Sequence, residues 1–216
     1  MKMYRDLAKR SFAHINRFTI ILTALCAAYL AIFLPGIFSK AYVHPFGIIL
    51  CFFAGPTSLY GICHMLYAIL GGYQKRVRSY IKAAPDPAFT QSQLEQAYAA
   101  ARHDNYLCIA GAWVFVQKGP ETYLYETQEL LWVYQHKSAV WEASTRQIKD
   151  YRYYLAIALT SGALALFEMP EEAAAGSLIL FKENTSGIAV GYSDERSALF
   201  QKSTQQFAQE VCGRAL

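Results

Sequence analysis

The sequence lacks the short motifs that mark the common nucleotide-binding and catalytic sites. It holds no G-x-G-x-x-G, no P-loop G-x-x-x-x-G-K-[ST] and no G-x-S-x-G. No dinucleotide fold, nucleotide phosphate loop or nucleophile elbow is therefore predicted, and no cofactor is expected. A non-catalytic protein is the main interpretation. An enzyme whose site is assembled from residues distant in sequence stays open as an alternative.

Cysteine is scarce, and its spacing argues against the common cysteine-based sites. The five cysteines are odd in number, include no C-x-x-C pair, and three of them (Cys26, Cys51 and Cys63) lie inside apolar runs. A disulfide framework needs paired cysteines, and a zinc site needs closely spaced ligands. No metal site is predicted, and the cysteines are interpreted as small hydrophobic residues in a reducing compartment.

Acidic residues are almost missing from the first part of the chain. Up to Lys82 there are ten Lys and Arg residues but a single acid, Asp6, whereas residues 86–216 hold fifteen acids and ten basic residues. This asymmetry predicts a basic, apolar membrane anchor that carries an acidic module. Nucleic acid is not an expected partner, because the acidic part would repel phosphate groups.

Charged residues are also absent from two long apolar runs, Phe18–Phe38 and Phe46–Tyr73. As a helix the first run is about 31 Å long, which matches a hydrocarbon core of about 30 Å. The second run is longer than one perpendicular crossing, so it must tilt, extend or kink, and Pro56 predicts a kink. Residues 1–83 are therefore expected to form a transmembrane hairpin, with spans of about 18–38 and 46–73 joined by a tight turn at Ser39–Pro45.

The basic residues predict the orientation of this hairpin. Five precede the first run and four closely follow the second, whereas the connection holds only Lys40. The positive-inside rule then places both termini in the cytoplasm. The sequence predicts a multi-pass protein of the cell membrane, with the lipid bilayer as a partner.

Two residues of the second run are candidate functional positions, His64 and Pro56. An ionisable residue inside a membrane span is a functional hypothesis, such as proton transfer or ligand contact. The alternative for His64 is a neutral side chain that is hydrogen-bonded near the cytoplasmic end of the helix. If the helices oligomerise around these two residues, the chain is instead a small transport-related subunit.

The remaining chain predicts an α+β fold. Residues 84–104 are expected to form a linker and a helix that ends near Arg102, with Thr90 as the N-cap and Gln93 completing a capping box. Residues 105–216 are expected to form a cytosolic antiparallel sheet with flanking helices. One of these helices begins near Glu171, and the last runs from near Asp194 to about Gly213. The apolar alternation predicts about five strands: Tyr106–Lys118, Glu121–Thr127, Glu129–Lys137, Tyr151–Leu159 and Ala163–Met169.

One predicted pair of strands has a membrane alternative. Tyr153–Phe167 is apolar, but as a helix its 15 residues would be only about 22 Å long, and Thr160-Ser161-Gly162 signals a turn in its middle. A β-hairpin is therefore favoured over a third span. A third span would move the C-terminus to the outside.

Aromatic residues mark the predicted sheet. Trp132 and Tyr134 share one face of their strand. Such stripes are most often sheet core, and core is the favoured interpretation. The alternative is an exposed interaction surface for a protein partner or a second copy of the chain.

Two short segments carry a family resemblance, LLWVY at Leu130–Tyr134 and VGYSDE at Val190–Glu195. They are similar to segments of an uncharacterised bacterial family that pairs two N-terminal spans with a cytosolic domain. A sheet closed by a C-terminal helix also resembles pleckstrin-homology-like domains, although that fold implies around seven strands and the pattern gives about five. The expected function is a membrane-tethered interaction or regulatory module, with no functional residue carried over from either resemblance.

Overall fold

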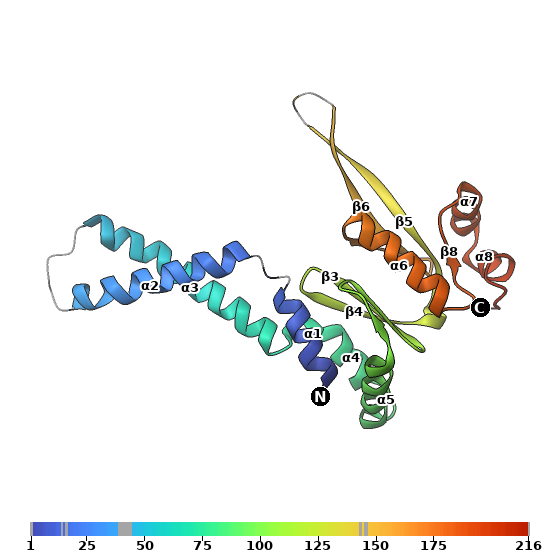
Figure 1. Cartoon of the computed structure of the whole chain (residues 1–216), viewed down its shortest axis with the longest axis horizontal. Coiled ribbons are helices and arrows are strands. Elements are labelled where there is room, and N and C mark those ends of the chain that lie inside the picture. The colour runs from blue at the N-terminus through green and yellow to red at the C-terminus, as the bar shows by residue number, and fades with distance from the viewer. Residues whose placement is uncertain are drawn as a thin grey trace. The chain divides into compact units, whose positions relative to one another are not determined.

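A computed structural model describes residues 2–13, 15, 17–38, 45–142, 144 and 147–215 of the chain. Within it the chain divides into two compact units (Figure 1). The first contains residues 3–75 with the turn 119–121, and the second contains residues 76–118 and 122–215. The tight turn predicted at Ser39–Pro45 lies, apart from Pro45, outside the described residues.

The first unit is built around two long apolar helices, α2 (Arg17–Phe38) and α3 (Pro45–Ile69). They pack on each other through small residues, because Thr23, Ala54 and Ser58 are all less than 10% exposed. At Gly61 the approach is so close that a Cβ atom would lie 1.8 Å from Thr23 Oγ1. Small residues at the contact let two helix backbones come together, as in helix pairs of membrane proteins.

Both helices are long and apolar enough to cross a membrane, as the sequence predicts. The second ends at Ile69 rather than at Tyr73, and a 3-10 turn, η1 (Gly72–Gln74), follows it. Helical structure continues through Pro56. Beside it, Thr57 Oγ1 donates a hydrogen bond of 2.8 Å to the carbonyl oxygen of Phe53, one turn earlier.

A further helix, α1 (Lys2–Ala13), precedes the two apolar helices and was not predicted from the sequence. Its residues Met3, Leu7 and Ser11 follow each other at a spacing of four and are almost completely buried. The amide of Gln74 donates a hydrogen bond of 2.9 Å to Ser11 Oγ, and neither residue is exposed to solvent. This bond connects the segment before α2 with the segment after α3.

The second unit begins with two helices, α4 (Lys75–Ala83, in this unit from Arg76 onward) and α5 (Pro87–Ala100). The predicted N-cap of α5 is wrong. Asp86, not Thr90, caps the helix, and its carboxylate accepts a hydrogen bond of 3.0 Å from the backbone N–H of Phe89. Proline at the first helical position needs no hydrogen-bond acceptor for a backbone N–H, so the helix can start before the expected cap.

The first sheet has four strands in the order β1-β2-β3-β4: β1 (Arg102–His103), β2 (Leu107–Ala110), β3 (Trp113–Lys118) and β4 (Glu121–Glu126). The predicted single strand Tyr106–Lys118 is thus two antiparallel strands. The chain reverses at Gly111, whose φ of +60° is favourable only for glycine and a few other residues. The predicted end of the preceding helix near Arg102 instead forms β1.

The second sheet has the order β7-β6-β5-β8: β5 (Leu130–Trp141), β6 (Ile148–Leu159), β7 (Leu164–Glu168) and β8 (Ala189–Val190). The β6–β7 pair is antiparallel, so the segment Tyr153–Phe167 is a hairpin, as favoured from the sequence. Strand β8 pairs parallel to β5 after helix α6 (Glu171–Asn184). The described residues therefore form eight strands in two sheets rather than about five in one.

The second sheet is covered on both faces. On one face, Val133, Leu155 and Ile157 pack with residues of the first sheet and with Phe181 of α6. On the other face, Trp132 and Ala156 pack beneath the C-terminal helices. These are two helices, α7 (Asp194–Lys202) and α8 (Thr204–Glu210), and not the single helix predicted from Asp194 to about Gly213. The chain breaks at Ser203, whose hydroxyl accepts a hydrogen bond of 3.1 Å from Gln206 N as the cap of α8.

Candidate functional site

Trp132 and Tyr134 lie together in the second sheet, as predicted, and both are buried. Trp132 is 2% exposed and Tyr134 is 7% exposed. Their rings stack with centroids 4.2 Å apart, and Trp132 Nε1 donates a hydrogen bond of 2.7 Å to the carbonyl oxygen of Gly191. Both side chains thus belong to the core, as in the interpretation favoured from the sequence, and little of their surface is left to contact a partner.

The C-terminal helices supply the cover over these rings. Phe207 of α8 is fully buried, with its ring centroid 5.6 Å from that of Trp132, and it meets Phe200 of α7 edge to face. Two polar contacts hold the start and end of this cover. Arg196 donates to the carbonyl oxygens of Val190 and Gly191, and Cys212 Sγ donates to that of Leu131.

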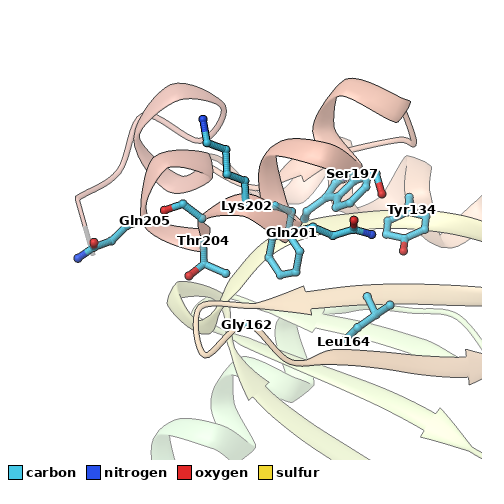
Figure 2. A pocket seen from close by; sticks show the side chains of 11 residues that line it. Tyr134, Gly162, Leu164, Ser197, Gln201, Lys202, Thr204 and Gln205 are labelled. Carbon is cyan, nitrogen blue, oxygen red and sulfur yellow. The ribbon is translucent and has the colours of Figure 1, made fainter.

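A cavity of about 570 Å³ opens between the C-terminal helices and the β6–β7 turn. We call it the C-terminal groove. Figure 2 shows α7 and α8 above it and the turn at Gly162 with Leu164 below. Its lining is Trp132, Tyr134, Gly162, Leu164, Ser197, Phe200, Gln201, Lys202, Ser203, Thr204 and Gln205.

The groove has an apolar floor and a polar rim. Tyr134 and Leu164 border the sheet side, and the Leu164 side chain is 47% exposed. The rim carries hydroxyl and amide groups, and Lys202 points its ammonium group away from the sheet (Figure 2). Burial raises the pKa of Tyr134, so its phenol is neutral at physiological pH. The groove thus offers uncharged donors and acceptors above an aromatic floor.

The other two candidate residues lie in α3 and do not form one site. Pro56 and His64 are eight residues apart on this helix, about 12 Å along its axis. The hydroxyl of Tyr73 is 2.8 Å from His64 Nδ1, and the ring of Tyr60 stacks on the imidazole at 5.8 Å. His64 is therefore hydrogen-bonded near the end of the helix, as in its structural interpretation. A transport role for the pair stays a prediction.

Among the residues with described positions, no three His, Cys, Asp or Glu side chains are placed to hold a metal ion. Cys108 is buried in β2, in agreement with its interpretation as a core residue.

Comparison with protein families gives one match. A family model described as "Domain of unknown function (DUF6709)" covers residues 71–200, more than half of the chain. The chain belongs to the DUF6709 family. The match starts after the second apolar helix and includes everything from η1 to most of α7. Membership of an uncharacterised family, expected from two short segments, is thereby confirmed. No curated protein and no solved structure matches the chain.

The DUF6709 region contains a hydrogen-bonded cluster that the sequence did not indicate. Tyr80 of α4 donates a hydrogen bond of 2.5 Å to Glu126 of β4 and accepts one of 3.1 Å from Trp113 Nε1. Burial, followed by the bond to Glu126, raises the pKa of Tyr80. One turn earlier, the Arg76 guanidinium lies 3.9 Å from the ring centre of Tyr123. These residues are 33 to 47 positions apart in sequence, so no local pattern could have paired them.

Proposed function

We propose that this protein is a membrane-tethered interaction module, in which α2 and α3 cross the bilayer and the DUF6709 domain binds a partner protein. The observation that carries the proposal is the apolar surface of the two helices. Only 6% of the apolar stretch of α2 and 17% of the apolar stretch of α3 is buried. Large side chains such as Ile32, Phe52 and Phe53 are at least 70% exposed. A core helix of a soluble protein would bury these side chains, whereas lipid accommodates them at no cost.

The flanking charges support an orientation for this anchor. Basic residues precede α2 and follow α3, and the connection between the helices holds one lysine. We therefore propose that both termini and the DUF6709 domain are cytoplasmic, in a multi-pass protein of the cell membrane.

The order of strands supports a pleckstrin-homology-like fold for residues 102–184. Seven strands precede a helix, arranged as four antiparallel strands followed by three, and α6 packs against the core shared by the two sheets. The five strands expected from the sequence had argued against this resemblance. In this proposal, β8, α7 and α8 are additions that cover the outer face of the second sheet.

The C-terminal groove is the proposed binding site. Its volume lies within the range of about 300–1,000 Å³ that is usual for ligand pockets. The hydroxyl and amide groups of its rim match the donors and acceptors of a peptide backbone, and the exposed Leu164 of its floor suits one apolar anchor side chain. The proposed occupant is therefore an extended segment of a partner protein that places an apolar residue against Leu164, which is 47% exposed.

Site-specific crosslinking in intact cells tests this proposal. A photoreactive benzoylphenylalanine replaces Leu164 in the groove or, as a control, Ile179, which is 58% exposed on α6. We expect a discrete protein adduct from position 164 and none from position 179. Filling the groove with Gln201→Trp should abolish the adduct, whereas Gln93→Trp on α5 should preserve it.

Three results would contradict the proposal. Adducts of equal yield at both positions, or an adduct that survives Gln201→Trp, would show that the groove is not the binding site. Release of the full chain from membranes by alkaline carbonate would show that α2 and α3 do not anchor it.

A further inference from the structure

The second sheet continues into a two-stranded ribbon that leaves the body of the domain (Figure 1). We call residues 137–141 of β5 and 148–153 of β6 the β-arm. Strand β7 pairs only with residues 154–158, and β8 only with residues 132–133. In the part of the chain with described positions, the strands of the β-arm thus pair only with each other. The longer of its two strands has six residues, 148–153, which gives the β-arm a length of about 20 Å.

The β-arm has two unlike faces, because side chains alternate along each strand. One face carries Lys137 and Ala139 on β5 and Tyr151 and Tyr153 on β6, and the Lys137 ammonium lies 3.8 Å from the ring centre of Tyr151. At its outer end Trp141 is paired across the ribbon with Ile148. The opposite face carries Val140 and the polar residues Ser138, Arg152 and Asp150.

We call the face with Tyr151, Tyr153 and Trp141 the apolar face of the β-arm. Its outer end is open to solvent. Trp141 is 62% exposed, Ile148 43% and Tyr151 42%. These side chains lie beyond the two hydrophobic clusters that cover the faces of the second sheet, which end at Tyr134 on β5 and at Leu155 on β6. An exposed apolar patch with polar surroundings is characteristic of a surface that contacts a partner or a membrane.

The charge of the β-arm indicates which of these two contacts, with a partner or with a membrane, the patch makes. Together with the connection between its strands (residues 137–153), the β-arm holds four basic residues and two acids, whereas the rest of residues 86–216 holds six basic residues and thirteen acids. The β-arm therefore carries a net charge of +2 on a domain that is otherwise at −7. At physiological salt, charges are screened over about 8 Å, so the end of a 20 Å arm is screened from the acidic body. An anionic surface would repel the body of the domain and attract this end.

We infer that the β-arm inserts the Trp141–Ile148 end of its apolar face into the interface of an anionic membrane. Tryptophan and tyrosine favour the headgroup region of a bilayer, and Lys149 beside the pair supplies a contact to anionic headgroups. The inference rests on the proposed membrane anchor, which would hold the domain close to a lipid surface. The β-arm would then form a second, reversible membrane contact of the same chain.

Tryptophan quenching in the full-length protein tests this inference. The chain contains three tryptophans, so the difference in emission between the natural protein and Trp141→Phe isolates Trp141. The protein is reconstituted into phosphatidylcholine vesicles with or without phosphatidylserine, and lipids brominated on the acyl chains act as quenchers. In vesicles with phosphatidylserine, we expect a blue shift and a loss of the Trp141 emission.

Matched variants separate insertion from other effects. Ile148→Asp and Lys149→Glu should each restore the Trp141 emission. Ile179→Asp and Lys182→Glu make the same changes on exposed positions of α6 and should leave the quenching intact.

Each other outcome overturns the inference. Equal quenching in vesicles without phosphatidylserine would show that insertion of Trp141 does not depend on anionic lipid. Trp141 emission that acrylamide quenches but brominated lipid does not places the β-arm in water. Emission shielded from both quenchers indicates a second copy of the chain or another protein over the β-arm. If the protein is not retained in vesicles after alkaline extraction, the anchor itself has failed, which is distinguishable from a failure of the β-arm alone.

Discussion

The substitution Phe207→Ala tests how the C-terminal helices are attached to the second sheet. The Phe207 side chain is fully buried and contacts two aromatic rings, with centroid distances of 5.6 Å to Trp132 and 5.5 Å to Phe200. Truncation of a buried phenylalanine costs about 3–5 kcal/mol, of which contacts between aromatic rings account for about 0.5–1.5 kcal/mol each. A whole domain is stable by only about 5–15 kcal/mol, so this single change removes a large share.

The expected consequence is local opening of α7 and α8. A loss of 3–5 kcal/mol raises the opening equilibrium by at least about a hundredfold, because each 1.4 kcal/mol is a factor of ten. Amide hydrogen exchange of the full chain in detergent micelles, followed over residues 194–210, measures this opening directly. The matched control is Phe89→Ala, since Phe89 is 60% exposed and its loss should change stability by less than about 0.5 kcal/mol. Equal exchange in Phe207→Ala and the natural protein would refute the described packing of α8 on Trp132.

Two further predictions concern the cap of α5 and the buried phenol of the groove. Asp86→Ala should destabilise α5 by about 1 kcal/mol, whereas Thr90→Ala should be nearly neutral. Amide hydrogen-exchange rates over residues 87–100 measure both effects. A larger loss from Thr90→Ala than from Asp86→Ala would instead support Thr90 as the cap. Burial raises the pKa of Tyr134 above its ordinary value of 10.0. Its contribution to stability is therefore fully present below about pH 10 and is lost as the pH rises through the higher folded pKa. Phenolate absorbance combined with unfolding at alkaline pH measures this loss, and Tyr134→Phe should make it smaller; an unchanged loss in that variant would assign the effect to other tyrosines.

Properties that depend on one segment at a time were predictable from the sequence. Run length and the absence of charge located α2 and α3 to within a few residues, because those helices need no distant partner to be recognised. The hairpin β6–β7 followed from a short apolar segment with Gly162 at its turn, where φ is +82°. The second span ended early because a 3-10 turn at Gly72 interrupts an apolar run that hydropathy alone treats as continuous.

Other features depended on contacts that no local pattern contains. Gly111 lies within an apolar stretch that alternates like a single strand, and only the pairing of β2 with β3 reveals the turn. The C-terminal groove needs the β6–β7 turn and the α7–α8 break to meet, over about 40 positions of sequence. Trp132 and Tyr134 were recognised as a pair, but their cover by Phe207 was not, because an isolated helix pattern does not say which surface it covers. The β-arm was missed because the predicted strands ended at Lys137 and began at Tyr151.

The hydrogen bond between Gln74 and Ser11 has a consequence for the order of events during synthesis. Its two partners are 63 residues apart, and both apolar helices lie between them. At roughly 5–20 residues per second, the ribosome needs roughly three to twelve seconds to reach Gln74 after it has added Ser11. During that interval α1 has no partner for its buried hydroxyl. This bond can therefore form only after both apolar helices have been synthesised.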